Sequence, residues 1–368
     1  MTDLEAAIAA VRPLDEGAMA AARAHLERLT KPTGSLGRLE ELAITLAGIT
    51  GEPAPALEPR RIVIVAGDHG IARRGVSAYP PEVTGQMVDN FLAGGAAINA
   101  LAGWAGASVV VVDAGVATTL PRTRAGGRTK ARLVSAPIRP GTGDISVGPA
   151  MTRQEALRSV ELGLLVAADM SREGIGVTGV GEMGIGNSTS ASAITAAMTG
   201  RDVRTVTGRG TGVDDRLRAR KVDLIERAIT VNRPDIADPI GVLAAVGGLE
   251  IGTLVGLILG SAAAGIPVVL DGFITGSAAL IAAALCPAVR PRLIAAHRSP
   301  EPGHDVILER LGLSPILDLE LRLGEGTGAA LAIGLLDAAC RVRDEMATFD
   351  SAGVSGPARS LSLSRVVC

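Results

Sequence analysis

Short and nearly continuous apolar runs recur along the chain, separated by segments with a helical pattern. The runs are rich in β-branched residues and cover residues 62–65, 108–112, 176–180, 203–207, 267–270 and 293–296. Continuous apolar runs are typical of strands buried on both faces of a parallel sheet. The helical segments cover residues 82–103, 151–171, 188–199, 214–231, 241–264 and 276–286. This alternation predicts βαβ units, and therefore an α/β fold whose parallel sheet has helices on both faces.

The two ends of the chain depart from this alternation. Residues 3–30 and roughly 326–346 are helical in pattern, and no apolar strand accompanies them. We expect a small helical domain built from both ends, residues 1–40 and 326–350, and a large α/β domain over residues 41–325. Residues 351–368 contain Ser, Gly and Arg and are expected to form a disordered tail.

The most apolar long stretch, residues 243–266, raises the question of a membrane span. It contains Glu250 and many Gly and Ala residues, which favours a buried helix. The first residues of the chain lack the basic and apolar regions of a signal peptide. The three cysteines are far apart, with no CxxC pair: Cys286, Cys340 and Cys368. We therefore expect a cytoplasmic protein without membrane contact, and no metal site or disulfide built on cysteine.

Composition argues against two further classes of protein. Hydrophobic residues make up 47% of the 368 residues and the net charge is -2, whereas disordered chains have low hydrophobicity and high charge. Only 1% of residues are aromatic. Binding of nucleic acid requires a concentrated basic surface, and single strands require stacking side chains. The sequence therefore predicts no nucleic-acid partner.

Polar and Gly-rich motifs follow each of the predicted strands. They lie at residues 67–70, 113–115, 181–187, 208–212, 271–272 and 297–299. The carboxyl ends of parallel strands meet at one edge of a sheet, and ligands of open α/β sheets bind there. The sequence therefore predicts a ligand site at this edge.

The loop Gly181-Glu182-Met183-Gly184-Ile185-Gly186-Asn187 is the most informative of these motifs. Its glycines let backbone N–H groups approach a ligand closely, and the helix that follows favours an anion at its N-terminus. Phosphate binding is one interpretation of this pattern. An ordinary βα turn with a polar helix cap is the other, and spacing alone leaves both open.

Other loops carry charged candidates, each with two interpretations. Residues 208–212 precede a helix on which Lys221 is either a phosphate-binding cation or a solvated lysine. Glu325 stands between two glycines, where it is either a partly buried general base or a Glu that complements a helix dipole. Asp68 and His69 have no other His at ligand spacing, so we expect them to shape the wall of the site.

The segment Leu270-Asp271-Gly272-Phe273 has a weak similarity to the loop that binds phosphoribosyl pyrophosphate in other transferases. That loop normally carries paired acidic residues, which help to organise magnesium-bound pyrophosphate. Here only Asp271 is present. The segment therefore disfavours a magnesium-pyrophosphate donor.

Taken in order, five segments resemble the family of nicotinate-nucleotide–dimethylbenzimidazole phosphoribosyltransferases. They are KPTGSLGRLE (31–40), GDHG (67–70), GEMGIGN (181–187), LDGF (270–273) and RLGEGTGAALA (322–332). The resemblance extends over about residues 10–345 and is specific because the motifs occur in combination. It implies a Rossmann-like parallel sheet and a small helical domain. It also implies a homodimer, with the active site at the carboxyl ends of the strands near the partner subunit.

The match to the family's motifs assigns roles to particular residues. Glu325 is implied as the catalytic base, Glu182 as a second active-site acid and Lys221 as the active-site lysine. The glycine loops are implied to hold the nucleotide phosphate. The implied substrate-binding residues are Glu182, Met183, Gly184, Gly186, Asn187, Gly208, Gly210, Lys221, Gln86, Met87, Asp271 and Gly324. One departure concerns the base pocket, because some relatives have Gln where this chain has Met87 beside Gln86.

The reaction that the resemblance implies moves 5-phosphoribosyl from nicotinate mononucleotide to 5,6-dimethylbenzimidazole. Its products are α-ribazole 5′-phosphate and nicotinate, in the biosynthesis of the lower ligand of cobalamin. The leaving pyridinium is already cationic, so no metal, cofactor or general acid is expected. One carboxylate suffices to take the proton of the incoming base. Two alternatives stay open: a related transferase or hydrolase with another acceptor, such as another azole or a purine, and a noncatalytic nucleotide sensor.

Overall fold

A computed structural model describes residues 2–120, 131–210 and 212–356, and the chain divides into two compact units. The large unit comprises Met1–Leu14 and Leu57–Gly334, and the small unit Asp15–Ala56 and Leu335–Cys368. These bounds differ from those expected, because residues 1–14 belong to the large unit and residues 41–56 to the small one.

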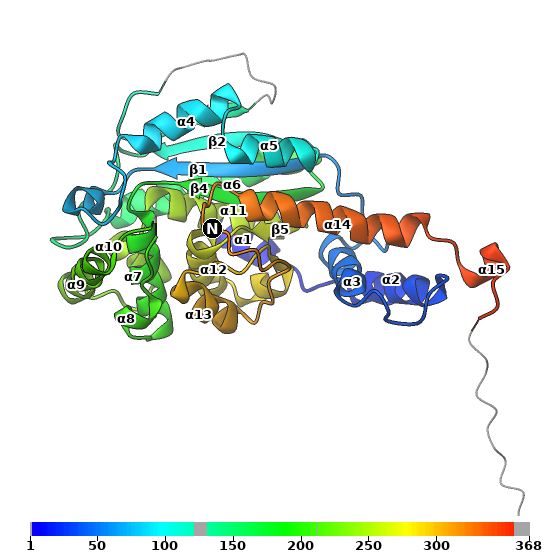
Figure 1. Ribbon diagram of the computed structural model, residues 1–368. Helices are drawn as coiled ribbons and strands as arrows, with labels where there is room; N and C mark the ends of the chain where they lie inside the picture. The colour runs from blue at the N-terminus through cyan, green and yellow to red at the C-terminus, as the bar shows by residue number, and fades with distance from the viewer. Residues whose placement is uncertain (1, 121–130, 211, 357–368) are drawn as a thin grey trace, which may run out of the picture. The chain divides into compact units, whose positions relative to one another are not determined.

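The large unit is built on a six-stranded parallel sheet with the order β3-β2-β1-β4-β5-β6 (Figure 1). Its strands are β1 (Arg60–Gly67), β2 (Ala107–Gly115), β3 (Arg132–Ser135), β4 (Val177–Met183), β5 (Val268–Leu270) and β6 (Leu293–Ala295). In register, Val63 pairs with Val110 on one side and Val180 on the other. The strand order reverses between β1 and β4, which is where doubly wound α/β proteins bind ligands. The expected α/β sheet is confirmed.

One predicted strand is wrong and one strand was not predicted. Residues 203–207 form the short helix α8 (Val203–Val206), in which Asp202 accepts a hydrogen bond from the Arg204 N–H at 2.7 Å. The Thr205 hydroxyl also donates to the Asp202 carbonyl. These local side-chain contacts stabilise a helical turn against the β-preference of the branched residues. The unpredicted strand β3 lies at an edge and has no fully buried residue, so no continuous apolar run marks it.

Helices cover both faces of the sheet. The segment expected as one helix over 82–103 forms α4 (Val83–Ala93) and α5 (Ala97–Trp104), which pack on one face (Figure 1). Helices α6 (Arg153–Arg172) and α11 (Leu249–Ala263) lie on the other face. Glycines bring α6 and α11 together: a Cβ on Gly163 would lie 1.9 Å from the Thr253 carbonyl oxygen. Close backbone approach therefore replaces large side chains at this crossing.

The apolar stretch 243–266 is two helices and not one. Helix α10 (Pro239–Val246) ends at Gly247, and α11 begins after Gly248. The break places Glu250 in the first turn of α11, buried at the carboxyl end of the sheet. Within the described residues, no helix is long and apolar enough to cross a membrane.

The remaining helices connect or flank the strands. In the large unit they are α1 (Asp3–Ala10), η1 (Gly70–Arg74), α7 (Asn187–Thr199), α9 (Asp215–Asn232), α12 (Phe273–Leu285), η2 (Pro287–Arg292) and α13 (Pro302–Leu311). The small unit contains α2 (Glu16–Arg28), α3 (Arg38–Thr50) and α15 (Phe349–Ala352). The division between the units falls within α14 (Thr327–Glu345).

Two expectations concern segments at the ends of the described chain. In the KPTGSLGRLE segment, Lys31 forms an ion pair with Glu40 at 2.8 Å inside the small unit. The expected disordered tail begins in α15, which ends at Ala352, and residues 357–368 lie outside the described residues. Disorder of this tail therefore stays a prediction.

Candidate active site

A cavity of about 360 Å³ opens at the carboxyl edge of the sheet. It lies beside the end of β4 and the loops that follow β5 and β6. The residues that line it include Tyr79, Val83, Met87, Glu182, Met183, Gly184, Asn187, Ser188, Gly210, Asp271, Phe273, His297, Ser299, Glu301, Leu323, Gly324 and Glu325. Its volume is in the range of small-molecule sites.

Glu325 lies in the loop that leads into α14, and its backbone is in the left-handed region with φ 64°. Gly324 and Gly326 on either side have φ 83° and 84°. A non-glycine residue in this region costs about 1–2 kcal/mol. The Gly326 N–H donates to an Asp271 carboxylate oxygen at 3.2 Å, which holds the loop in place. The loop thus presents one carboxylate to the cavity at a local cost in stability.

The carboxylate of Glu325 is almost fully buried, with 5% of the residue exposed. Its Oε2 atom has no hydrogen-bond partner among the described residues. Burial, followed by the charge of Asp271, raises the pKa of Glu325 to about 7. A carboxylate with a pKa near the working pH is suited to act as a general base.

Asp271 follows β5 and caps the helix that begins after Glu325. Its Oδ1 atom accepts hydrogen bonds from the Gly328 N–H at 2.7 Å and the Ala329 N–H at 3.1 Å. Burial raises the pKa of Asp271, and the charge of His297 opposes this rise. Asp271 therefore orients the start of α14 and adds negative charge beside Glu325.

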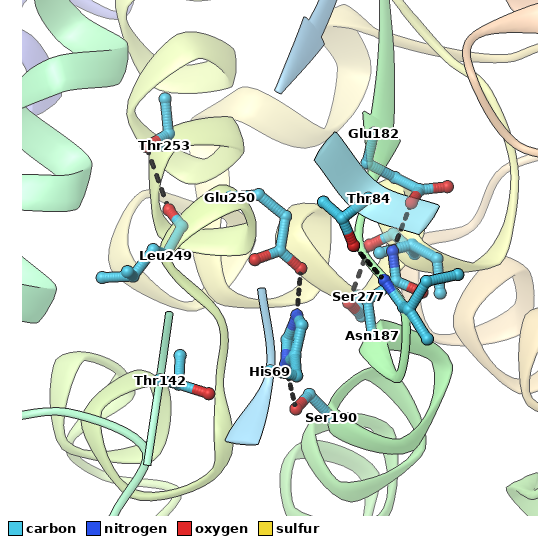
Figure 2. Close-up of polar contacts among 12 residues, drawn as sticks. His69, Thr84, Thr142, Glu182, Asn187, Ser190, Leu249, Glu250, Thr253 and Ser277 are labelled. Atoms are coloured by element: carbon cyan, nitrogen blue, oxygen red, sulfur yellow. Dashed lines mark hydrogen bonds and ion pairs between the residues drawn. The ribbon is translucent and has the colours of Figure 1, made fainter. Parts of the chain in front are cut away.

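Glu182 closes the acidic side of the cavity at the end of β4. Burial, followed by the charges of Asp271 and Glu250, raises the pKa of Glu182 to about 8. The Asn187 side-chain amide donates to the Glu182 carboxylate (Figure 2). A Cβ on Gly324 would lie 2.5 Å from Glu182 Oε1, so only glycine leaves room for this carboxylate. The neutral form of Glu182 therefore predominates at pH 7.

The opposite part of the cavity carries features suited to an anion. Helix α7 begins after Gly186 without a side-chain cap, and Asn187 and Ser188 of its first turn line the cavity. The Lys221 ammonium donates to the Ser188 hydroxyl at 2.8 Å. Lys221 is fully buried, and burial lowers its pKa to about 8. An uncapped helix start beside a buried cation favours a phosphate or carboxylate ligand.

Glu301 joins the same part of the cavity from the start of α13. Its Oε1 atom accepts a hydrogen bond from the Gly210 N–H at 2.7 Å, and its Oε2 atom has no partner among the described residues. A Cβ on Gly208 would lie 2.3 Å from Glu301 Oε2. The glycines of the 208–212 loop thus make room for this carboxylate.

The structure brings most of the expected site residues to one cavity. Those that line it are Glu325, Glu182, Met183, Gly184, Asn187, Gly210, Met87, Asp271 and Gly324. Gly186 caps α7, and Lys221 stands behind Ser188. Gly208 packs against Glu301, and Gln86 is exposed on α4, so neither of them lines the cavity. The roles of all these residues stay predictions.

Several lining residues were not among the expected ones. Tyr79 and Glu301 come from loops whose sequence carries no motif for them, and Leu323 lies within the RLGEGTGAALA motif but was given no role. His297 and Ser299 belong to a motif that follows the last strand, at the edge where a ligand was expected, although no role was assigned to them.

Asp68 and His69 were expected to form part of the site wall, but neither lines this cavity. Both instead line a second hollow of about 870 Å³, together with arginines that include Arg73, Arg74 and Arg139. The side chain of His69 is fully buried, in an ion pair with Glu250. The second hollow is lined neither by Glu182, Asp271 and Glu325 nor by the start of α7.

In the residues that the structure describes, no group of three or more His, Cys, Asp or Glu side chains is arranged to hold a metal ion.

Fold and site together define a doubly wound α/β protein with a buried carboxylate of raised pKa and an uncapped helix start in one cavity at the carboxyl edge of its sheet. Comparison with known proteins gives the family. A family model described as "Phosphoribosyltransferase" matches residues 11–354. The nicotinate-nucleotide–dimethylbenzimidazole phosphoribosyltransferase of Roseiflexus sp. (strain RS-1) is 55% identical over 356 residues, covering 97% of this chain and 99% of the relative.

Two further comparisons agree with this result. The protein of the same name from Chloroflexus aggregans is 55% identical over 345 residues, covering 94% of this chain and 96% of the relative. The crystal structure of the Thermus thermophilus protein of that name superposes with a TM-score of 0.86 at 45% identity, covering 94% of this chain and all of that one. The chain belongs to the family of nicotinate-nucleotide–dimethylbenzimidazole phosphoribosyltransferases.

Proposed function

We propose that this protein transfers the 5-phosphoribosyl group of nicotinate mononucleotide to 5,6-dimethylbenzimidazole. The observation that carries the proposal is Glu325, a buried carboxylate that lines the cavity with an unpartnered oxygen and a pKa raised to about 7. Membership of the family supports the choice of substrates.

The reaction balances without a further reactant. One ring nitrogen of dimethylbenzimidazole attacks the anomeric carbon of the ribosyl group. The bond from this carbon to the pyridinium nitrogen breaks, and its electron pair neutralises the departing nicotinate ring. The N–H proton of the other benzimidazole nitrogen passes to Glu325. Attack from the face opposite nicotinate inverts the anomeric centre and gives the α-ribotide.

The two halves of the cavity suit the two substrates. We assign the mononucleotide phosphate to the start of α7, where Ser188 is held by Lys221. The flat base is assigned to the apolar side, lined by Tyr79, Met87 and Leu323. Glu325 lies on the wall of the same cavity. Holding two substrates in line for attack supplies a large part of the rate enhancement of a transfer reaction.

The neutral Glu182 has a separate role in this assignment. A protonated carboxyl does not repel the anionic substrate and can donate a hydrogen bond to it. An ionised carboxylate would repel the substrate and could not donate. Burial and the neighbouring acids that raise its pKa to about 8 keep this proton in place at pH 7.

We also propose that the protein is a homodimer whose second subunit lies close to the mouth of the cavity. Tyr79 and Leu323 line the cavity and are 55% and 57% exposed, which is unusual for large apolar side chains at a small-molecule site. Light scattering on the purified protein tests the assembly, and a monomer at micromolar concentration would contradict it.

The direct test of the reaction is product analysis by mass spectrometry. Purified protein is incubated with nicotinate mononucleotide and dimethylbenzimidazole, beside a Glu325→Gln variant. Formation of the benzimidazole ribotide with release of nicotinate supports the proposal. Binding of the mononucleotide without ribotide would contradict it, and would favour a transferase with another acceptor or a nucleotide sensor.

A further inference from the structure

A buried polar network lies beneath the cavity and takes no part in the chemistry described above. The His69 Nε2 N–H donates to Glu250 Oε1 at 2.7 Å, and His69 Nδ1 forms a hydrogen bond with the Ser190 hydroxyl at 3.1 Å (Figure 2). The side chains of His69 and Glu250 are fully inaccessible, and Ser190 is fully buried. Three elements meet here: the loop after β1, the first turn of α11 and the first turns of α7.

The order Ser–His–Glu resembles that of a hydrolytic triad, but its position excludes nucleophilic catalysis. Ser190 is fully buried inside α7 and does not line the cavity. A substrate therefore cannot reach its hydroxyl. The network must act through the elements that it joins.

Glycines shape the space around this network. A Cβ on Gly248 would lie 2.5 Å from Glu250 Oε2 and 2.6 Å from His69 Cε1. A Cβ on Gly67 would lie 3.0 Å from Glu250 Oε2. Any larger residue at Gly248 would force the pair apart, and Gly248 is also where the apolar stretch breaks into α10 and α11. Burying a polar group is costly unless it is hydrogen-bonded, and Glu250 Oε1 and both ring nitrogens of His69 are hydrogen-bonded here.

The network lies close to the loop between Glu182 and Asn187. A Cβ on Gly184 of this loop would lie 2.4 Å from the Gly67 carbonyl oxygen and 3.4 Å from His69 Cδ2, so the loop passes close to both groups. Ser190 is one helical turn beyond Asn187 on α7, and Asn187 donates to Glu182. The ring of His69 therefore lies close to the loop and is bonded to the helix that follows it.

A second observation places the network within electrostatic reach of the site. The charge of Glu250 is one of the causes that raise the pKa of Glu182, after burial and Asp271. Glu250 Oε2 has no hydrogen-bond partner among the described residues, whereas Oε1 is bonded to His69.

We propose that Ser190, His69 and Glu250 are positioning residues, which hold the 183–187 loop and the start of α7 in the geometry that the transfer reaction requires. This inference rests on the proposed function. Glu250 fixes the orientation of the imidazole, and Ser190 transmits that orientation to α7. The role of these three residues differs from that of an ordinary core contact because the loop next to His69 also lines the cavity.

The test compares hydroxyl deletions at two buried positions of α7. Ser190→Ala removes the contact with His69, whereas Thr195→Val removes a hydroxyl that bonds only to the Ala191 carbonyl of the same helix. We expect Ser190→Ala to lower kcat/KM for nicotinate mononucleotide about tenfold, because small misplacements of binding and reacting groups slow reactions strongly. Thr195→Val should stay within about twofold of the wild type, since it leaves the loop untouched.

A second pair of variants keeps the inference testable if Ser190→Ala folds poorly. Glu250→Gln retains an oxygen that accepts from His69, and Glu250→Ala does not. A positioning role predicts that Glu250→Gln keeps most of the kcat and that Glu250→Ala loses at least as much as Ser190→Ala. Thermal unfolding is measured for each variant, and kcat and KM are taken at a temperature where all of them are folded.

Two outcomes would overturn the inference. They are a Ser190→Ala variant as active as Thr195→Val, and a Glu250→Ala variant as active as Glu250→Gln. Failure of the proposed function is separate, because it shows as a wild type that forms no ribotide. In that case calorimetric binding of nicotinate mononucleotide decides: equal affinity of Ser190→Ala and Thr195→Val overturns the network, and about tenfold weaker binding by Ser190→Ala supports it.

Discussion

Two glutamates next to helix starts in this protein have opposite surroundings. Glu155 lies in the first turn of α6, where it closes a capping box with Thr152 and pairs with Arg139 at 3.4 Å. Those contacts outweigh its burial and lower its pKa. Glu325 precedes α14, has an oxygen without a partner among the described residues, and has its pKa raised to about 7.

The difference lies in which group caps the helix. At α6 the Glu155 carboxylate accepts from the Thr152 N–H, the Thr152 hydroxyl accepts from the Glu155 N–H, and the charge of Glu155 stabilises the helix start. At α14 Asp271, which follows β5, accepts from the first N–H groups, so Glu325 does not cap the helix. A carboxylate is thus available for chemistry when a second acid caps the helix.

The largest effect is expected from exchanging the two glutamates for glutamine in separate variants. Glu325→Gln should lower ribotide formation by about 10²–10⁴-fold, because it removes the group that accepts the proton. Glu155→Gln should leave activity within about twofold and lower the free energy of unfolding by less than about 1 kcal/mol, because Gln still closes the capping box and only the charge interactions with the helix start and Arg139 are lost. Steady-state kinetics and urea unfolding measure both. Equal losses of activity in the two variants would refute the contrast.

Lys221 extends the comparison to a buried cation. Lys221→Met keeps the length of the side chain and removes the charge that holds Ser188. We expect KM for nicotinate mononucleotide to rise about 10–100-fold, in line with the loss of a hydrogen bond from a charged group. KM for dimethylbenzimidazole serves as the internal control and should change little. A variant with an unaltered KM for the mononucleotide would remove Lys221 from the phosphate site.

The pH dependence of the reaction tests the cause of the raised pKa of Glu325. Its ionised form is the base, so kcat/KM should rise through a pH of about 7. The charge of Asp271 contributes to that pKa, so Asp271→Asn should move this limb of the profile to lower pH, besides lowering the rate. A profile with the limb unmoved would show that burial alone sets the pKa.

The dependence of stability on pH tests the surroundings of Glu182 and Glu155 independently of activity. Glu182 goes from a pKa of 4.5 to about 8 on folding, so the folded state binds the extra proton. The stability from this group is complete below pH 4.5 and is lost as the pH rises towards 8, by at most about 1.4 kcal/mol per pH unit. The wild type should therefore lose stability relative to Glu182→Gln over this range.

Glu155 provides the opposite slope. Its pKa is lowered on folding, so its contribution is present above 4.5 and is lost on acidification. The wild type should lose stability relative to Glu155→Gln only as the pH falls below that value. Urea unfolding across the pH range measures both slopes, and slopes of the same sign would contradict the assignment of the two environments.

Strongly buried elements of the fold were predictable from the sequence, whereas weakly marked ones were not. Continuous apolar runs identified β1, β2, β4, β5 and β6, because a strand covered on both faces leaves no room for polar side chains. Residues 203–207 were misread because β-branched composition does not reveal that Asp202 will cap a turn. The edge strand β3 carries little apolar signal because it buries little surface.

The candidate site shows the same division. Motifs at strand ends led to Glu182, Asn187, Asp271 and Glu325, which do line one cavity. No motif indicated that Glu301 would bond to the Gly210 N–H, since these residues are 91 positions apart and meet only through the fold. Gln86 and Met87 are neighbours on α4, and only the packing of that helix decides that Met87 faces the cavity.

By itself the sequence determined the class of fold, the edge of the sheet that binds ligands, and the family, because apolar periodicity and Gly-rich motifs are local properties of the chain. The tertiary structure alone decided which carboxylates stay protonated, which helix starts are left uncapped, and where Glu250 meets His69. Burial and charge proximity cause these properties, and both depend on groups brought together from distant parts of the chain.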